Sequence, residues 1–236
     1  MALVLVSITA CRTFSVQQER QIKTTQNIQL GTIGIHKNFI IEHAYNVAAT
    51  PQFLNPIKVK VSRIPFNKVK LKAFERAKSA QNKAIVVNYI DSVNPKPHFL
   101  KLEIADRVAV LKSVNAKENT AVFQFLKNKT NAHLVSTISV VFEAQTATKL
   151  STAQEVFLEH TGSKYVLKTY NQNNEQQSIH LSEGVIFGYQ TSNTCWKENH
   201  KRQLEIIDFV ESNERCPLNS SRLARHAKKK QDYKNF

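Results

Sequence analysis

The chain has 236 residues, of which 42% are hydrophobic, so it can bury a substantial core and is not disordered as a whole. Five glycines are too few for a glycine-rich fibre, and no run of eighteen apolar residues predicts a membrane-spanning helix. The net charge of +15 is uneven. Residues 56–83 hold nine basic and one acidic side chain (+8), and residues 222–236 hold six and one (+5), so the remainder is nearly neutral.

The first ten residues, MALVLVSITA, carry no charge and end directly at Cys11. The stretch Ile8-Thr9-Ala10-Cys11 resembles the lipobox of bacterial lipoproteins, in which one apolar and two small residues precede a cysteine. This resemblance implies that residues 1–10 are a signal peptide, complete or truncated, and that Cys11 receives acyl chains. Several chains on one residue hold a protein firmly on a membrane. By the same resemblance, Arg12 favours the outer membrane. The residues alone leave an alternative open, in which this stretch is a buried strand with Cys11 in the core.

The polar segment that follows, including QQERQIKTTQN, predicts a flexible tether over residues 11–29. A globular domain is then expected over residues 30–218. Its first half mixes strands and helices. Strands are predicted at 57–64, where Ile57, Val59 and Val61 alternate with lysines, and at 84–90 and 98–105. Helices are predicted at 68–81, after Asp106 as the cap with Asn115 near the end, and at 121–127.

From His133 onward the sequence consists of short β-rich runs separated by turn-like residues, as in TGS, NQNNEQ and SEG. This spacing predicts an antiparallel meander with a last strand in RQLEIIDFVE. The fold class is therefore α+β, with a mixed first half and a β-meander second half in one domain. The basic residues 219–236 lack apolar periodicity and are expected to be disordered.

The other two of the three cysteines, Cys195 and Cys216, flank one segment of the predicted last strand. If lipid occupies Cys11, an even number remains, and we expect these two to form a disulfide in an oxidising periplasm or at the cell surface. Two reduced thiols in a cytosolic protein are the alternative. No spacing typical of a metal site occurs around them.

The two basic segments predict contact with an anionic surface, such as lipid head groups, cell-wall polymer or nucleic acid. A solvated face that keeps the protein soluble is the competing interpretation. The residues expected to make this contact are Lys58, Lys60, Lys68, Lys70, Lys72, Lys228, Lys229 and Lys230.

Motifs of common enzymes are absent: there is no GxSxG, HExxH, GxxxxGK[ST] or GxGxxG. No catalytic residue, metal site or cofactor is predicted. The leading hypothesis is a lipid-anchored envelope protein whose domain acts as a structural or adaptor component, in contact with membrane, cell-wall polymer or envelope proteins. The alternatives are a cytosolic protein that binds nucleic acid through its basic segments, and a secreted hydrolase without a familiar motif.

Overall fold

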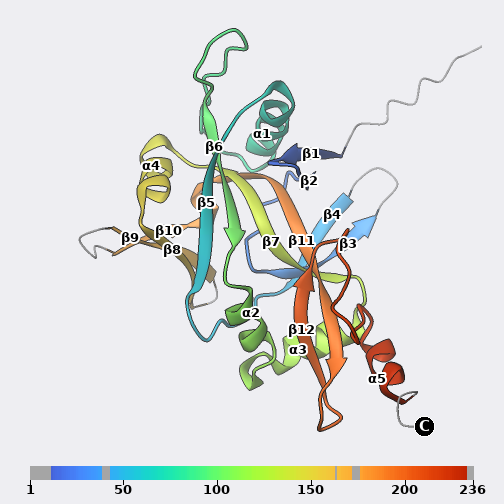
Figure 1. Ribbon diagram of the computed structural model, residues 1–236. Helices are drawn as coiled ribbons and strands as arrows, with labels where there is room; N and C mark the ends of the chain where they lie inside the picture. Colours follow the sequence, from blue (N-terminus) through green and yellow to red (C-terminus); the bar gives the residue numbers. More distant parts are fainter. Residues whose placement is uncertain (1–11, 39–42, 163, 172–175, 233–236) are drawn as a thin grey trace, which may run out of the picture.

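The computed structural model describes residues 12–38, 43–162, 164–171 and 176–232 (Figure 1). The predicted signal peptide and the predicted lipidation site, Cys11, lie outside the described residues. The side chains of Lys229 and Lys230 also lie outside them.

Strands dominate the fold. They are β1 (Thr13–Val16), β2 (Glu19–Lys23), β3 (Ile33–Asn38), β4 (His43–Ala49), β5 (Ile57–Pro65), β6 (His98–Ile104), β7 (Ala132–Val141), β8 (Glu155–Thr161), β9 (Lys164–Tyr170), β10 (Gln176–His180), β11 (Val185–Glu198) and β12 (Leu204–Val210). The α-helices are α1 (Lys68–Ala80), α2 (Arg107–Val114), α3 (Thr120–Asn128), α4 (Ala144–Thr152) and α5 (Ala224–Asp232), with two short 3₁₀ turns at Lys117–Asn119 and Leu181–Glu183.

The strands form one antiparallel sheet in the order β1-β2-β11-β7-β6-β5-β8-β9-β10. Strand β12 pairs with β11, and β3 joins β4 to β7. This large antiparallel sheet with several helices confirms the predicted α+β class. Strands β8, β9 and β10 follow one another as a meander, whereas β7 lies between β6 and β11.

The longest strand, β11, organises the sheet because it changes partners along its length (Figure 1). It pairs with β7 from Val185 to Ser192, with β2 at Gly188 and Tyr189, and with β12 from Asn193 onward. A register shift between Gln190 and Thr191 marks a bulge at this point. Bulges redirect side chains and are common beside functional sites.

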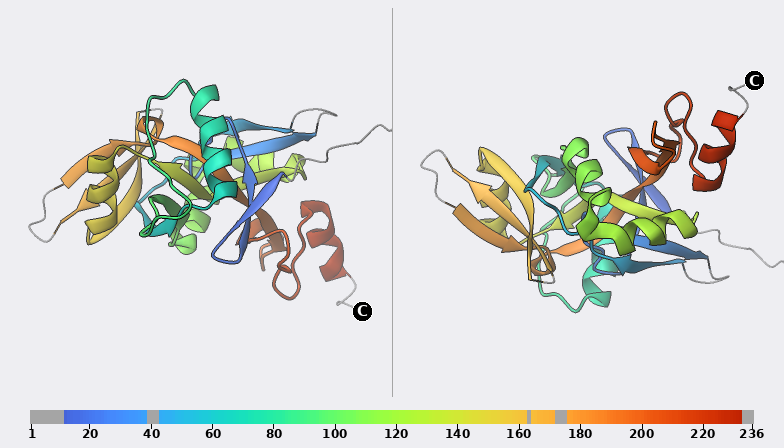
Figure 2. Two further views of the ribbon diagram at one scale, coloured as in Figure 1. Left: turned by 90° about the horizontal axis from the view of Figure 1, so that it is seen from above. Right: turned by 90° about the horizontal axis from the view of Figure 1, so that it is seen from below.

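Two apolar cores cover opposite faces of the sheet, as the alternation along β6 shows. Phe99 packs under α1 with Phe66, Phe74 and Phe187, whereas Leu100 belongs to the larger core that also contains residues of α2 and α3. Figure 2 accordingly shows α1 in front of the sheet in the view from above and α3 in front of it in the view from below. The end of α1 is fixed to β11, because the Gln81 amide donates to the Ile186 carbonyl (2.6 Å) and accepts from the Ile186 N–H (3.2 Å).

Local sequence signals account for several elements. The Asn67 side chain accepts from Lys70 N (2.9 Å) and begins α1, and Asp106 likewise accepts from Ala109 N (2.9 Å) and begins α2. Strand β5 alternates as predicted, with Ile57 and Val59 buried and Lys58 exposed. The helices predicted at 68–81 and 121–127 are confirmed as α1 and α3.

The predicted tether at 11–29 is wrong over β1 and β2, which form a hairpin. Phe14 and Val16 are buried, and Phe14 stacks on Phe187 with ring centroids 5.7 Å apart. The turn residues Gln17 and Gln18 both have positive φ, 48° and 69°. A two-residue turn with positive φ is typical of a tight hairpin. Glutamine is not among the residues usual in such turns, so the sequence does not predict it.

The strand predicted at 84–90 is also wrong, because this segment has no strand partner. Ile85 is buried against the α1 core, whereas Val86 is 74% exposed and Ile90 is 60% exposed. Strands β5 and β6 pair directly with one another, from Val59↔Ile104 to Pro65↔His98. The connecting segment therefore lies on the core without joining the sheet.

The predicted disorder of 219–236 is wrong over the described part of this segment, which contains α5. Trp196 N donates to the Ser221 carbonyl (2.7 Å), and Ser221 N donates back to the Trp196 carbonyl (2.9 Å). Ala224 and Ala227 are buried in the larger core. Two small apolar residues one turn apart are enough to hold a short helix whose other side chains are mostly basic.

Candidate functional site

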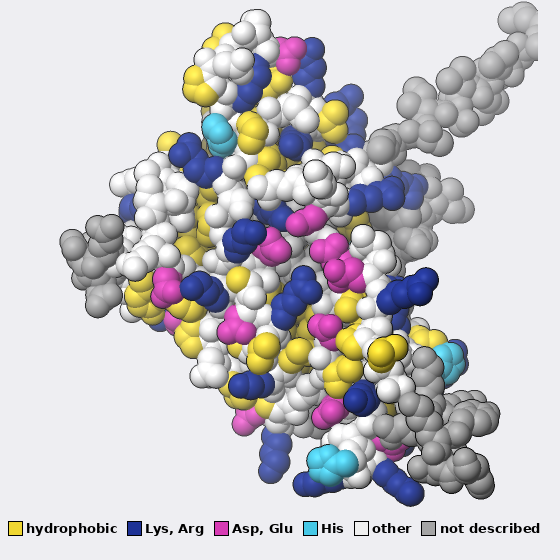
Figure 3. Space-filling model, in the orientation of Figure 1, with side chains coloured by type: hydrophobic (Ala, Val, Ile, Leu, Met, Phe, Trp, Pro, Cys, Tyr) yellow, Lys and Arg dark blue, Asp and Glu magenta, His cyan; other side chains and the backbone are white. Residues whose placement is uncertain are grey.

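A polar band crosses the sheet on the same face as the α1 core. In one row, Ser139 of β7 lies between Lys101 of β6 and Gly188 of β11. In the next row, Thr137 of β7 lies between Glu103 of β6 and Gln190 of β11. Side chains directly opposite one another in an antiparallel pair share a face. The strands β6, β7 and β11 therefore carry polar side chains on this face, next to the apolar core that α1 covers. Figure 3 shows Asp and Glu side chains gathered over the middle of the sheet, with Lys and Arg around them.

Lys101 lies at the centre of this band with its side chain only 2% exposed. Its Nζ is 2.5 Å from Glu19 Oε2 and 3.3 Å from Glu103 Oε2. A buried ammonium is tolerated only where carboxylates compensate the lost hydration. Lys101 thus binds the β1–β2 hairpin, through Glu19, to the central strand β6.

A second polar contact fixes the hairpin to β7. Gln21 is fully buried, and its Oε1 accepts from Ser139 Oγ at 2.6 Å. Gly188 allows this approach, because a Cβ there would lie 2.8 Å from Gln21 Oε1 and 2.4 Å from Phe14 Cζ. The absence of a side chain at position 188 lets the hairpin lie close against β11.

A cavity of about 590 Å³ opens beside the hairpin, where β11 passes from β2 to β12. Tyr189 is the last residue paired with β2, and Asn193 is the first paired with β12. The lining includes Thr13, Glu19, Arg20, Gln190, Thr191 and Glu211. This volume is typical of sites for small ligands. A narrow crevice lined by Glu103, Arg107 and Phe209 also reaches Glu211.

The surroundings of Glu211 disfavour its ionised form. Burial, together with the negative charges of Glu19 and Glu214, raises the pKa of the Glu211 carboxyl. Arg107 and a hydrogen bond from the Gln190 side chain act in the opposite direction but do not cancel the effect. A raised carboxyl pKa indicates an environment that disfavours further negative charge. The cavity is therefore lined by charges of both signs, with Arg20 beside Glu19 and Glu211.

A second cluster, of rings, joins β3 and β4 to β7 and β11. His36 lies among Tyr45, His133 and Tyr189, with ring centroids 5.1, 5.2 and 5.8 Å away. The Tyr45 hydroxyl donates to the His133 carbonyl (2.7 Å). Burial lowers the pKa of His133 and raises the pKa values of both tyrosines, so these three groups are neutral at neutral pH. The cluster packs the β3–β4 hairpin against the sheet.

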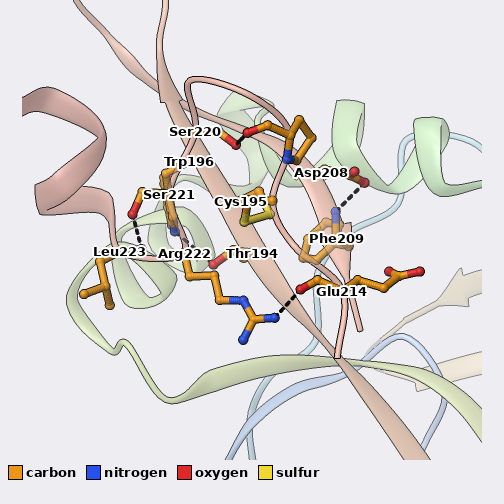
Figure 4. The surroundings of a disulfide bond; sticks show 12 residues. Thr194, Cys195, Trp196, Asp208, Phe209, Glu214, Ser220, Ser221, Arg222 and Leu223 are labelled. Atoms are coloured by element: carbon orange, nitrogen blue, oxygen red, sulfur yellow. Dashed lines mark hydrogen bonds between the residues drawn. A yellow bond between two sulfur atoms is a disulfide. The ribbon is translucent and has the colours of Figure 1, made fainter. Parts of the chain in front are cut away.

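The predicted disulfide between Cys195 and Cys216 is present, with Cα atoms 5.6 Å apart (Figure 4). It fastens the segment after β12 onto β11. Nearby, the Arg222 guanidinium donates to the carbonyls of Glu211 (3.2 Å), Ser212 (3.0 Å) and Glu214. The backbone that carries Glu211 into the cavity is thus held from two sides, by a covalent bond and by Arg222.

No protein-family model, no curated protein and no solved structure matches this chain. Within the described ranges, no group of three or more His, Cys, Asp or Glu side chains could hold a metal ion. None of the described helices combines the length and hydropathy that crossing a membrane requires.

The predicted anionic-surface lysines are not brought together into one patch. Lys58 and Lys60 lie on β5, where Lys58 Nζ pairs with Glu155 Oε1 at 2.8 Å. Lys68, Lys70 and Lys72 lie on α1, and Lys228, Lys229 and Lys230 lie on α5, at the opposite end of the molecule (Figure 1).

The three α1 lysines differ in surroundings. Lys68 Nζ pairs with Asp91 Oδ2 at 2.8 Å, Lys70 lies over the Phe99 ring and burial lowers its pKa, and Lys72 is exposed. Sequence reasoning found these charges but missed the cavity residues Glu19, Gln190 and Glu211. No local motif contains them, since they meet only where β11 changes partners.

Proposed function

We propose that this chain is a lipid-anchored protein of the bacterial cell envelope whose folded part is a non-catalytic binding domain. The observation that carries the proposal is the Cys195–Cys216 disulfide. Disulfides persist in oxidising compartments such as the periplasm and the cell surface. Of the three cysteines, this pairing leaves Cys11, the residue that ends the lipobox-like stretch, for acylation.

The position of the hairpin refines this proposal. The Arg12 carbonyl accepts from Lys23 N at 3.0 Å, and β1 begins at Thr13. An acyl group on Cys11 would therefore be separated from the folded domain by a single residue. We infer that such an anchor would hold the domain directly at the bilayer surface, and that Arg12 favours the outer membrane.

Helix α1 supplies the basic surface that this arrangement would use. Phe74 of α1 and Phe14 of β1 both pack on Phe187, so α1 lies alongside the anchored hairpin (Figure 2). Lys68, Lys72 and Arg76 are exposed at i, i+4 spacing on one side of the helix. Basic side chains near an anionic leaflet each contribute about 1 kcal/mol of attraction. These residues are the proposed contact with anionic lipid or wall polymer.

Intact-mass measurement on protein purified from its producing cell tests the anchor. The expected result is loss of residues 1–10 together with added acyl mass on Cys11. Cys11→Ser should release the protein from membranes, whereas the paired variant Cys195→Ser/Cys216→Ser, which leaves Cys11 intact, should remain membrane-bound.

A bare Cys11 in that material would overturn the proposal. Recovery from the cytosol with reduced thiols would favour the nucleic-acid-binding alternative. Saturable turnover of a wall-derived substrate would favour a secreted hydrolase.

A further inference from the structure

The segment that joins α1 to β6, residues 81–97, carries apolar side chains that the fold does not cover. We call it the α1–β6 loop. Ile85 is buried in the core beneath α1, and Val87 packs against that core. Val86, between them, is 74% exposed, and Ile90 is 60% exposed. Apolar residues on both sides of an extended segment are typical of a strand that is covered on both faces, whereas here one side remains open to solvent.

The tip of the α1–β6 loop is held in a defined shape by its own hydrogen bonds. Val93 N donates to the Ile90 carbonyl at 3.2 Å and closes a turn. Lys96 Nζ donates to the carbonyls of Ile90 (3.2 Å), Val93 (2.7 Å) and Asp91. Figure 1 shows this loop projecting beyond α1 and β6. With Val93 also 50% exposed, three apolar side chains, including that of Val86, therefore stand on an ordered, projecting loop.

The charges around these apolar side chains are almost all positive. Residues 68–97 hold seven basic and two acidic side chains (+5). Both acids are paired, Asp91 Oδ2 with Lys68 Nζ at 2.8 Å and Glu75 Oε2 with Lys78 Nζ at 2.5 Å. Figure 3 shows hydrophobic side chains beside Lys and Arg on this part of the surface. The α1–β6 loop and α1 together are therefore complementary in charge to an anionic partner.

From these features we propose that the α1–β6 loop inserts Val86, Ile90 and Val93 between the head groups of an anionic lipid bilayer. The apolar side chains gain by leaving water for the acyl boundary, and the surrounding basic residues gain from the negative charge of the leaflet. Wall polymer and nucleic acid would attract the basic residues but offer no apolar layer for the three aliphatic side chains. The inference rests on the proposed location at the bilayer, and it adds a contact that needs no acyl chain.

A tryptophan placed at the tip of the loop tests the insertion. The full chain carrying Cys11→Ser removes the acyl anchor, and Trp196, the only native tryptophan, is buried. With vesicles of phosphatidylglycerol and phosphatidylethanolamine in equal parts, the added indole of Ile90→Trp should shift its emission to shorter wavelengths and be quenched by brominated lipid. Leu218→Trp, at a 92% exposed position in the segment before α5, is the control and should not respond.

Co-sedimentation with the same vesicles measures how much the apolar side chains contribute. Val86→Ser/Ile90→Ser should weaken binding roughly tenfold or more, because two apolar side chains no longer leave water. Val108→Ser/Leu218→Ser is the matched control and should bind as the parent chain does, since it removes exposed apolar side chains (60% and 92%) outside the loop. Thermal unfolding and circular dichroism establish that each variant is folded.

Three results would each overturn the proposal: no response of Ile90→Trp to vesicles, an equal response of Leu218→Trp, or equal vesicle binding by the two folded double variants. Binding to a DNA duplex without binding to vesicles would also overturn it and would assign the basic surface to nucleic acid. The anchor is judged separately, by the mass of Cys11. A bare cysteine in native material together with insertion of the loop would remove the anchor alone.

Discussion

Lys101 Nζ and Glu19 Oε2 lie 2.5 Å apart and join the central strand β6 to the N-terminal hairpin. The ammonium is almost fully buried, whereas the Glu19 side chain keeps 30% of its surface exposed. The lysine therefore depends on the carboxylate more than the carboxylate depends on the lysine, because its hydration has been removed.

We expect Glu19→Gln to lower the free energy of unfolding by about 1–3 kcal/mol, since a charged hydrogen bond to a buried ammonium is lost. Urea denaturation measures this change. Glu155→Gln is the control, because its ion pair with Lys58 is exposed on both sides and should contribute less than about 1 kcal/mol. Adding Lys101→Met to Glu19→Gln should restore part of the stability. Equal losses in the Glu19 and Glu155 variants would show that burial of Lys101 has no energetic consequence.

Phe14→Ala tests whether the hairpin is an integral part of the fold. Phe14 is 6% exposed and stacks on Phe187, so truncation should cost about 3–5 kcal/mol. Ser15→Ala, at the neighbouring exposed position of the same strand, should change stability by less than about 0.5 kcal/mol. A free tether would instead make the two variants equally harmless in thermal unfolding.

Removing the disulfide with Cys195→Ser/Cys216→Ser should destabilise the protein by roughly 3 kcal/mol, as the chain-entropy model gives for a loop of this size, with a sequence separation of 21. Hydrogen exchange should accelerate at the Trp196 and Ser221 amides, which bond to one another's carbonyls. Wild type under reducing conditions should behave like the variant. Unchanged unfolding in both cases would contradict a structural role for this bond.

The raised pKa of Glu211 predicts a specific pH dependence of stability. The folded protein holds this proton more tightly than the unfolded chain does. The carboxyl therefore contributes stability that is fully present below its unfolded pKa and is lost as the pH rises through its folded pKa. Glu211→Gln should be more stable than wild type at neutral pH, and the difference should disappear below the ordinary value of 4.5.

Denaturation of wild type and Glu211→Gln across this pH range measures the effect, with exposed Glu118→Gln as the reference. A pH-independent difference would mean that Glu211 acts through packing rather than charge.

Several features follow from the sequence because they depend on neighbouring residues. Asn67 and Asp106 cap helices through side chains three residues from their targets, and alternation along residues 57–61 distinguishes the buried side of β5 from the exposed side. The Cys195–Cys216 pair followed from the cysteine count once Cys11 was assigned to the lipobox-like stretch. The order of apolar residues was sufficient to predict the α+β class. Some segments repeat every two residues, as strands do, and others every three to four, as helices do.

Other features depend on pairing between segments far apart in the sequence, and only the tertiary structure reveals them. The polar hairpin at 13–23 forms because Phe14 and Val16 find a place beside Gly188 and Phe187, and residues 84–90 stay outside the sheet because β5 and β6 pair directly. Glu19, Gln190 and Glu211 meet only where β11 exchanges β2 for β12. Sequence by itself determined the helix starts at Asn67 and Asp106, the alternation of β5 and the surplus of positive charge. The cavity beside the hairpin arises from contacts between distant strands, which local propensity does not encode.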